Sequence, residues 1–207
     1  MPPLVIAIAG GTGSGKSFLS DRIIESIDEI QGNAIEIDSY YKDLSDIPID
    51  ERELTNFDHP DSFEFDLLHK HIRMIKAGGE VSVPVYDYKT HTRTKSYQKV
   101  IGSDYIIING IMGLHDQSLR SLFDLSIFID IDSDIRLSRR IKRDMRYRKR
   151  TLNSIINQYL ESVKIMHDRF VEPTIQFADM VIKDTGRTEI DSICTKIRFI
   201  YDSYAKK

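Results

Sequence analysis

The sequence predicts an α/β fold, in which a mainly parallel sheet carries helices on both faces. Short apolar runs alternate along the chain with longer stretches of helical periodicity, which is typical of parallel α/β sheets. A glycine-rich segment lies between the first apolar run and the first amphipathic stretch, as expected of a tight strand-to-helix turn. With 207 residues, 41 % of them hydrophobic, the chain is expected to form one domain over residues 1–207.

The elements are expected in a definite order along the chain. Apolar runs predict buried strands at residues 4–9, 34–37, 105–108, 126–131 and 180–182. Apolar residues at helical spacing predict helices at 16–30, 65–77, 135–145, 152–166 and 190–204. Residues 81–86 and 96–101 alternate in the manner of strands around a polar turn at 89–92. An antiparallel hairpin inserted into the α/β core is therefore expected within residues 81–101.

Composition excludes several classes of protein. The single cysteine, Cys194, excludes an internal disulfide and a cysteine-rich metal site, and it is expected to be a small apolar residue of the last helix. No apolar run approaches the roughly 18 residues of a membrane span, so no membrane partner is expected. The first residues lack the basic region and cleavage site of a signal peptide, and a cytoplasmic location is expected.

Basic side chains gather in one segment, although the formal net charge is only −3. Within residues 136–150 the only acidic residue is Asp144, and the rest of the chain carries a charge of −11. The basic residues there are Arg136, Arg139, Arg140, Lys142, Arg143, Arg146, Arg148, Lys149 and Arg150. A protein that wraps nucleic acid is not usually so acidic elsewhere, so no nucleic-acid partner is expected. The segment suggests a smaller polyanion such as a nucleotide, with a solvated helix face as the alternative.

Residues 10–17 form the strongest motif. Gly10, Gly11, Thr12, Gly13, Ser14, Gly15, Lys16 and Ser17 match the phosphate-binding P-loop pattern G-x-x-x-x-G-K-[ST], between a predicted strand and a predicted helix. Glycines let several backbone N–H groups converge on phosphate oxygens, and the following helix points its free N–H groups at the same anion. Lys16 is expected to reach the β- and γ-phosphates of a nucleotide, and the Ser17 hydroxyl to bind Mg²⁺.

The P-loop indicates nucleotide binding but does not identify the reaction. The chain lacks the Asn-Lys-x-Asp motif with which GTPases read their base, and it is short for a motor or AAA-type ATPase. A small chain with an arginine-rich segment favours a kinase of a small molecule. In such kinases, arginines of a mobile lid, here expected at residues 136–150, close over the transferring phosphoryl group and exclude water.

Two segments suggest where an acceptor hydroxyl binds. Asp38 ends the second predicted strand and is the candidate base that takes a proton from the acceptor, with an N-cap or a surface carboxylate as the alternative. Residues 56–63 are dense in polar groups. Asp61 suits a sugar diol, because one carboxylate can accept from two adjacent hydroxyls, although Asp61 and Ser62 also suit capping of the following helix.

The hairpin carries a third candidate segment, at residues 84–93. Tyr86 and Tyr88 suit the faces of a flat ring, and His91 suits hydrogen bonding to its polar edge. Ordinary hairpin packing and solubility are the alternative interpretation.

Together these segments resemble the uridine kinase (uridine–cytidine kinase) family over residues 5–184, in matching order. The resemblance lies in residues 10–17, 38–41, 56–63, 84–93, 136–150, 158–159, 172–174 and 178–179. It implies a three-layer P-loop sandwich and transfer of the γ-phosphoryl group of ATP or GTP to the 5′-hydroxyl of uridine or cytidine, with Mg²⁺ as cofactor. It also implies a homo-oligomer, commonly a tetramer in this family.

The resemblance assigns roles to matching residues. Catalysis is assigned to Asp38, Lys16 and Arg139, and nucleotide binding to residues 10–17 with Arg143, Arg148 and Arg150. Substrate binding is assigned to Asp61, Tyr86, Tyr88, His91 and Arg136. Mg²⁺ is assigned to Ser17, Asp38 and the position of Asn109.

Three positions depart from the family pattern. The family usually has Glu-Gly-Ile after the central strand, where the Glu helps hold Mg²⁺, but this chain reads Asn109-Gly110-Ile111. An Asn carbonyl can bind Mg²⁺ or one of its waters, but it carries no charge. Ser154 stands where some relatives have a base-contacting Gln, and Lys149 replaces a glycine of the lid. These two changes leave the contacts to the base and the motion of the lid open.

Two other functions stay open at this point. Asn109 suggests a nucleotide-binding regulatory protein with weak or no kinase activity, which the intact Lys16 and Asp38 argue against. A P-loop kinase of another small hydroxyl acceptor, such as pantothenate or ribulose phosphate, would share the scaffold but not need the hairpin tyrosines. Asp130 and Asp132 follow the next predicted strand, and the sequence does not show whether they reach the metal.

Overall fold

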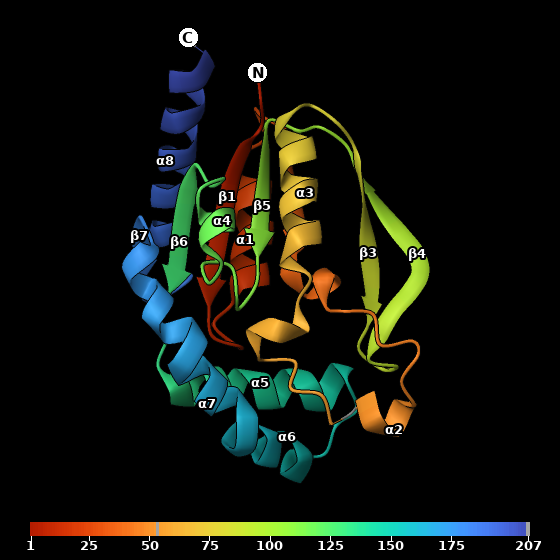
Figure 1. Ribbon diagram of the computed structural model, residues 1–207. Helices are drawn as coiled ribbons and strands as arrows, with labels where there is room; N and C mark the ends of the chain where they lie inside the picture. Colours follow the sequence, from red (N-terminus) through yellow and green to blue (C-terminus); the bar gives the residue numbers. More distant parts are fainter. Residues whose placement is uncertain (53, 206–207) are drawn as a thin grey trace.

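A computed structural model describes residues 1–52 and 54–205. Its main sheet contains β1 (Leu4–Gly10), β2 (Gly32–Glu36), β5 (Tyr105–Asn109), β6 (Leu125–Ile129) and β7 (Met180–Ile182). The strand order is β2-β5-β1-β6-β7, and all four neighbouring pairs are parallel. Figure 1 shows this sheet between helices, with a separate hairpin beside it. The predicted α/β fold is confirmed.

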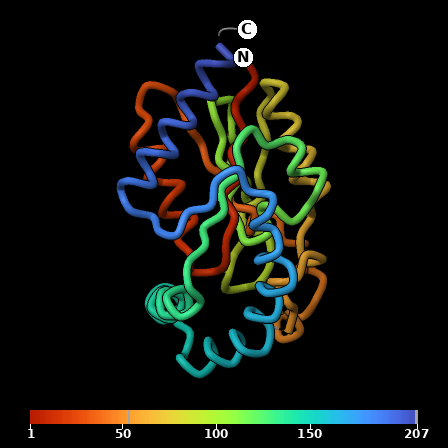
Figure 2. Tube along the Cα trace, turned by 90° about the vertical axis from the view of Figure 1, so that its left-hand side faces the viewer, coloured from red at the N-terminus to blue at the C-terminus, as the bar shows by residue number. Residues whose placement is uncertain are grey.

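Helices connect these strands. They are α1 (Lys16–Ser26), α2 (Ile49–Arg52), α3 (Phe65–Lys76), α4 (Gln117–Arg120), α5 (Ser133–Tyr147), α6 (Leu152–Gln158), α7 (Lys164–Met166) and α8 (Arg187–Ala205), with 3₁₀ turns at Ile37–Tyr40 and Pro60–Ser62. π-Helical turns at Tyr159–Val163 and His167–Val171 join α6 and α7 to a 3₁₀ stretch at Glu172–Phe177. Residues 152–177 therefore wind continuously along one side of the molecule, as Figure 2 shows. None of the helices in the described ranges is long and apolar enough to cross a bilayer.

Alternation along the strands divides the core into two layers, one on each side of the sheet. Ile6 and Ile8 of β1 pack in a cluster with residues of α1 and α8. Val5 and Ala7 of the same strand pack in a second cluster with residues of α3 and α4. Because successive residues of a strand point to opposite faces, a strand buried on both sides must be apolar throughout, and β1 is.

The predicted hairpin is confirmed as β3 (Val81–Asp87) paired antiparallel with β4 (Thr92–Val100). It forms its own two-stranded sheet, and the pairing shifts register between Pro84 and Tyr86. Proline has no N–H to donate to a ladder, so an irregularity at this point is expected.

Some predicted boundaries were wrong. The helix expected over 16–30 ends at Ser26, where Ile27 turns into the core instead of continuing the helix. The strand expected over 34–37 ends at Glu36, because Ile37 begins the 3₁₀ turn that carries Asp38. The strand expected over 126–131 ends at Ile129. Cys194 is a buried free cysteine of α8, as predicted.

One carboxylate ties three elements together at the amino edge of the sheet. Asp124 accepts hydrogen bonds from the backbone N–H of Val5 at 2.8 Å, from the Lys76 ammonium at 3.0 Å and from the Tyr204 hydroxyl at 2.9 Å. Only 10 % of its side chain is exposed. It therefore holds β1, α3 and α8 at one point, far along the strands from the P-loop edge.

We expect Asp124→Ala to lower the free energy of unfolding by about 2–3 kcal/mol, because the buried N–H of Val5 loses its acceptor and the Lys76 ammonium loses its carboxylate. Urea unfolding measures this change. Asp21→Ala removes an exposed carboxylate of α1 and is expected to shift the same quantity by no more than about 0.5 kcal/mol. Equal shifts for the two variants would contradict the role of Asp124.

Candidate active site

The P-loop connects β1 to α1 at the carboxyl edge of the sheet. Gly13 has φ +76°, and a Cβ there would stand 2.3 Å from the carbonyl oxygen of Arg136. Gly15, with φ +101°, lies immediately before the first residue of α1. Both positions need a residue that accepts positive φ, and Gly13 also needs one without a side chain. This backbone leaves the N-terminus of α1 open to a phosphate.

Lys16 lies under the loop that it follows. Its ammonium donates to the carbonyl oxygens of Gly10 at 2.9 Å and Gly11 at 3.0 Å. Burial lowers the pKa of Lys16 to about 8, although the nearby Asp38 carboxylate acts in the opposite direction. Phosphate groups beside Lys16 would raise this pKa again, because they favour the charged form of the ammonium.

Helix α5 packs directly on the P-loop through three arginines. The Arg136 Nε donates to the carbonyl of Ile131 at 2.9 Å. Arg139 donates to the carbonyl of Ser14 at 3.3 Å, and Arg140 to the Thr12 hydroxyl at 3.1 Å. Arg136 is buried, and its guanidinium packs against the P-loop, where a Cβ at Gly11 would lie 2.2 Å from it. This packing supports the P-loop, and the substrate-binding role expected of Arg136 stays a prediction.

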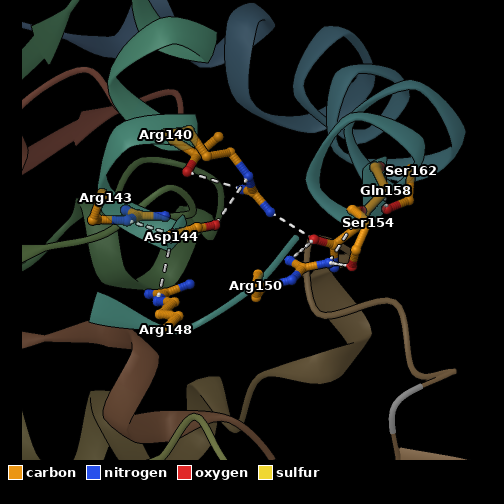
Figure 3. A network of polar contacts seen from close by, with 9 residues as sticks. Arg140, Arg143, Asp144, Arg148, Arg150, Ser154, Gln158 and Ser162 are labelled. Carbon is orange, nitrogen blue, oxygen red and sulfur yellow. Dashed lines mark hydrogen bonds and ion pairs between the residues drawn. The ribbon is translucent and has the colours of Figure 1, made fainter. Parts of the chain in front are cut away.

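The lid arginines converge on Asp144. This carboxylate is 0 % exposed. It accepts from the Arg143 Nε at 2.8 Å and lies 3.6 Å from the Nε atoms of both Arg140 and Arg148 (Figure 3). The only acid of the basic segment is thus the common partner of three of its arginines. It reduces the repulsion that would otherwise push these side chains apart.

Gln158, the last residue of α6, accepts hydrogen bonds from two arginines of the basic segment. Its Oε1 accepts from Arg150 at 2.5 Å and from Arg140 at 2.7 Å, as Figure 3 shows. Arg150 also donates to the Ser154 hydroxyl at 2.8 Å. Lys149, where the family resemblance expects glycine, has φ +56°. The backbone therefore takes a turn here that glycine accepts more easily than lysine.

The candidate base Asp38 faces the hairpin. Its Oδ2 accepts a hydrogen bond from the Tyr88 hydroxyl at 2.9 Å. The Arg148 guanidinium lies over the Tyr88 ring, 4.2 Å from the centroid. Burial and the Asp38 carboxylate both raise the pKa of Tyr88, so this phenol stays a donor. The 3₁₀ turn after β2, the hairpin and the lid meet at this contact.

Aromatic rings surround this contact. Tyr86 lies edge-on to Tyr88, with ring centroids 5.2 Å apart, and 5.0 Å from Tyr41. His91 stacks on Phe57 at 5.2 Å with an interplanar angle of 19°. The three hairpin residues predicted for ring binding therefore lie in one aromatic cluster with Tyr41 and Phe57, two residues that the sequence reasoning did not single out.

Within residues 56–63, Asp58 rather than Asp61 lies near the candidate base. The Asp61 side chain is 88 % exposed, and it lies 3.5 Å from the Nδ1 of His59. Asp58 is partly buried. Burial raises the pKa of Asp58, Arg140 opposes this, and the negative charge of Asp38 adds to it. The sequence signal for Asp58 was its place directly after Phe57, a ring of the cluster.

The capping alternative for this segment was wrong. Helix α3 begins after Glu64, and no side chain caps it. The Ser62 hydroxyl instead donates to the carbonyl of Asn56 at 2.7 Å, which closes the loop on itself.

The oxygen donors near the P-loop suit Mg²⁺, which prefers hard oxygen ligands. They are the Ser17 hydroxyl, the carboxylates of Asp38 and Glu36, and the carbonyl of Asn109. No cluster of three or more His, Cys, Asp or Glu side chains in the described part of the chain is placed to hold a metal. Mg²⁺ at nucleotide sites needs no such cluster, since phosphate oxygens and water complete its coordination. Asp130 and Asp132 line a different polar cavity together with His167.

Comparisons with solved structures agree with the fold. A kinase from Silicibacter sp. TM1040, described as a putative fructose transport system kinase, aligns with a TM-score of 0.70 at 19 % identity, covering 87 % of this chain and 89 % of that one. A structure of a possible uridine kinase from Bacillus stearothermophilus aligns with a TM-score of 0.62 at 21 % identity, covering 88 % and 90 %. At these identities the likeness concerns the fold alone.

Comparisons of sequence are closer. The uridine kinase of Clostridium novyi (strain NT) is 45 % identical over 202 residues, 97 % of each chain. The uridine kinase of Halalkalibacterium halodurans is 45 % identical over 205 residues, 98 % of this chain and 97 % of that one. The model of the phosphoribulokinase / uridine kinase family matches residues 5–191. On this evidence the chain belongs to the phosphoribulokinase / uridine kinase family.

Proposed function

We propose that this protein is a nucleoside kinase that transfers the γ-phosphoryl group of ATP or GTP to the 5′-hydroxyl of uridine or cytidine, giving UMP or CMP. One observation carries the proposal. Asp38 and the hairpin tyrosine Tyr88 are in contact, and the charge of Asp38 acts on Lys16 of the P-loop. An acceptor base, a ring-binding surface and a phosphate cradle thus meet at one edge of the sheet. The relatives named uridine kinase, 45 % identical over almost the whole chain, favour the same reaction.

The phosphate donor binds at the P-loop. Backbone N–H groups of the loop and of the first turn of α1 hold its phosphates, and Lys16 turns from the carbonyls of Gly10 and Gly11 to the phosphate oxygens. Ser17, Asp38 and Asn109 would hold Mg²⁺, which would supply positive charge to offset that of the phosphates. Asp38 and Lys16 keep the acceptor oxygen and the γ-phosphoryl group in line.

Asp38 takes the proton of the acceptor hydroxyl. The Tyr88 hydroxyl donates to Oδ2 of the same carboxylate, so the acceptor hydroxyl shares Asp38 with Tyr88 or competes with it. The new bond joins O5′ to the γ-phosphorus, and the bond from the γ-phosphorus to the β–γ bridging oxygen breaks. The proton stays on Asp38 until the products leave, and the leaving group is ADP or GDP.

Two groups of residues complete the site. Asp58 accepts from the ribose hydroxyls, while Tyr86, Tyr88 and His91 line the place of the base. The lid arginines Arg143, Arg148 and Arg150, with Arg139, lie over the phosphates and exclude water during transfer. Asp144 keeps these cations close together, since it pairs with three arginines at once.

The partners follow from the reaction: a nucleoside, a nucleoside triphosphate and the metal. A kinase of another acceptor is less well supported, because the aromatic cluster offers a surface suited to a planar ring. The homo-oligomer, the absence of nucleic-acid and membrane partners, and the cytoplasmic location stay predictions.

Coupled ADP release tests the reaction directly. With Mg-ATP, we expect turnover with uridine or cytidine and none with thymidine or adenosine. Asp38→Asn is expected to lower kcat about 10³-fold, since it removes the base but keeps its shape. Turnover with pantothenate or ribulose 5-phosphate in place of nucleosides would overturn the proposal. Nucleotide binding without turnover on any acceptor would favour a regulatory protein.

A matched pair of variants tests the assignment of the ribose carboxylate. Asp58→Asn removes a carboxylate that accepts hydrogen bonds in the nucleoside site, and we expect it to raise the KM for the nucleoside at least tenfold. Asp61→Asn removes a carboxylate whose side chain is 88 % exposed, and we expect it to change the KM by no more than about twofold. Steady-state kinetics at saturating ATP measures both. The reverse pattern would return the role to Asp61.

The pKa of Lys16 predicts proton uptake on nucleotide binding. The free protein loses the Lys16 proton near pH 8, whereas the phosphates hold Lys16 in its charged form. Binding of ATP should therefore take up a proton at pH 8–10 and almost none below pH 7, and affinity should fall as pH rises above 8. Calorimetry in buffers of different ionisation enthalpy measures the uptake. Lys16→Arg keeps the charge throughout this range, so uptake should disappear; unchanged uptake would assign the proton to another group.

A further inference from the structure

Glu36 is a carboxylate at the edge of the active site to which the family resemblance gives no role. It is the last residue of β2, and in the ladder it pairs with Asn109 of β5. Asn109 pairs in turn with Ile8 of β1, which packs in the layer of α1. Paired residues of neighbouring parallel strands project to the same face, so Glu36 and Asn109 stand side by side under the N-terminus of α1.

Glu36 contacts Ser17, the P-loop residue that is expected to bind Mg²⁺. The Ser17 hydroxyl donates to the Glu36 Oε1 at 2.8 Å. A serine hydroxyl that gives its lone pair to a metal can still give its proton to a carboxylate. The two interactions are therefore compatible, and the carboxylate orients the hydroxyl while making its oxygen a better donor.

The Asn109 side chain cannot supply a negative charge to the metal. It is neutral, and it is only 4 % exposed, whereas Glu36 is exposed at the same edge. Asp130 and Asp132 do not substitute for it, since they line the cavity near His167 and Glu172. Among these acidic residues, Glu36 is the one that touches the P-loop hydroxyl and lies beside Asn109.

We propose that Glu36 supplies, from the neighbouring strand, the negative charge that Asn109 does not bring to Mg²⁺, acting through the Ser17 hydroxyl and the water molecules of the metal. Glu36 is thus a positioning residue for the cation. The proposal rests on the proposed function, because that function requires a nucleotide bound with Mg²⁺ at the P-loop.

The measurement is the gain in nucleotide affinity that Mg²⁺ provides. A fluorescent ATP analogue is titrated into the protein twice, once in EDTA and once in saturating Mg²⁺, with no nucleoside present. The ratio of the two dissociation constants is the coupling between metal and nucleotide. For Glu36→Gln, which keeps the size and the acceptor oxygen but removes the charge, we expect the ratio to fall about tenfold. Affinity in EDTA should stay equal or become tighter, because a negative charge near the phosphates is gone.

Two further variants separate this role from a structural one. Glu36→Gln combined with Asn109→Glu returns a carboxylate to the adjacent position and should restore most of the ratio. Glu25→Gln removes an exposed carboxylate later in α1, which pairs with Arg22, and should leave the ratio unchanged. Thermal melting shows that each variant is folded before titration.

The outcomes distinguish the two proposals. If Glu36→Gln weakens binding equally with and without Mg²⁺, or if the double variant restores nothing, Glu36 only shapes the loop and the inference is wrong. If the wild-type protein binds the analogue with a clear gain from Mg²⁺ but phosphorylates no nucleoside, the proposed function fails, while the effect of Glu36 on the gain is still measured.

Discussion

The close contact between the P-loop and helix α5 is the constraint on which the rest of the site depends. The backbone of α5 approaches so near that only glycine fits at residue 13, and Arg136 fills the space beside Gly11. Arg139 and Arg140 then bond to the loop from the next turn of the helix. The P-loop and α5, which carries Arg143, are therefore one packed unit, whereas Arg148 and Arg150 follow the last residue of this helix.

The lid and the acceptor site are joined by a chain of contacts instead of being separate devices. Asp144 binds Arg148, the Arg148 guanidinium lies over Tyr88, and the Tyr88 hydroxyl bonds to Asp38. A hydroxyl that displaces Tyr88 from Asp38 therefore also disturbs the position of Arg148. In the proposed kinase, these contacts give a physical route from the nucleoside to the arginines that we propose lie over the phosphates. The contacts run through Tyr88 of the hairpin, so this insertion outside the main sheet lies against Asp38 and Arg148.

Several site predictions depended on which residue of a polar segment turns inward, and the sequence alone could not decide this. Asp58 and Asp61 are both followed by residues that fit a loop, and both suit a sugar diol. The loop closes through Ser62 and Asn56, which leaves Asp61 in solvent and Asp58 near Asp38. In the same way, Arg136 and Arg139 read alike as members of a basic run. Their places on α5 separate them: Arg136 is buried and donates to the carbonyl of Ile131, whereas Arg139 donates to the carbonyl of Ser14 in the P-loop.

The sequence by itself determined the α/β fold, the P-loop, the inserted hairpin and the concentration of arginines, because each rests on local periodicity or on a contiguous motif. Only the tertiary structure decided which residues from distant parts of the chain become neighbours in the site. Glu36 and Asn109 lie 73 positions apart but pair across two parallel strands, and Tyr88 and Asp38 meet through a hydrogen bond between residues 50 positions apart. Strand order and register, which depend on packing of the whole core, set these neighbours. The charge around a metal depends on all residues that the fold brings next to it. The absence of a carboxylate at one position therefore does not by itself determine that charge.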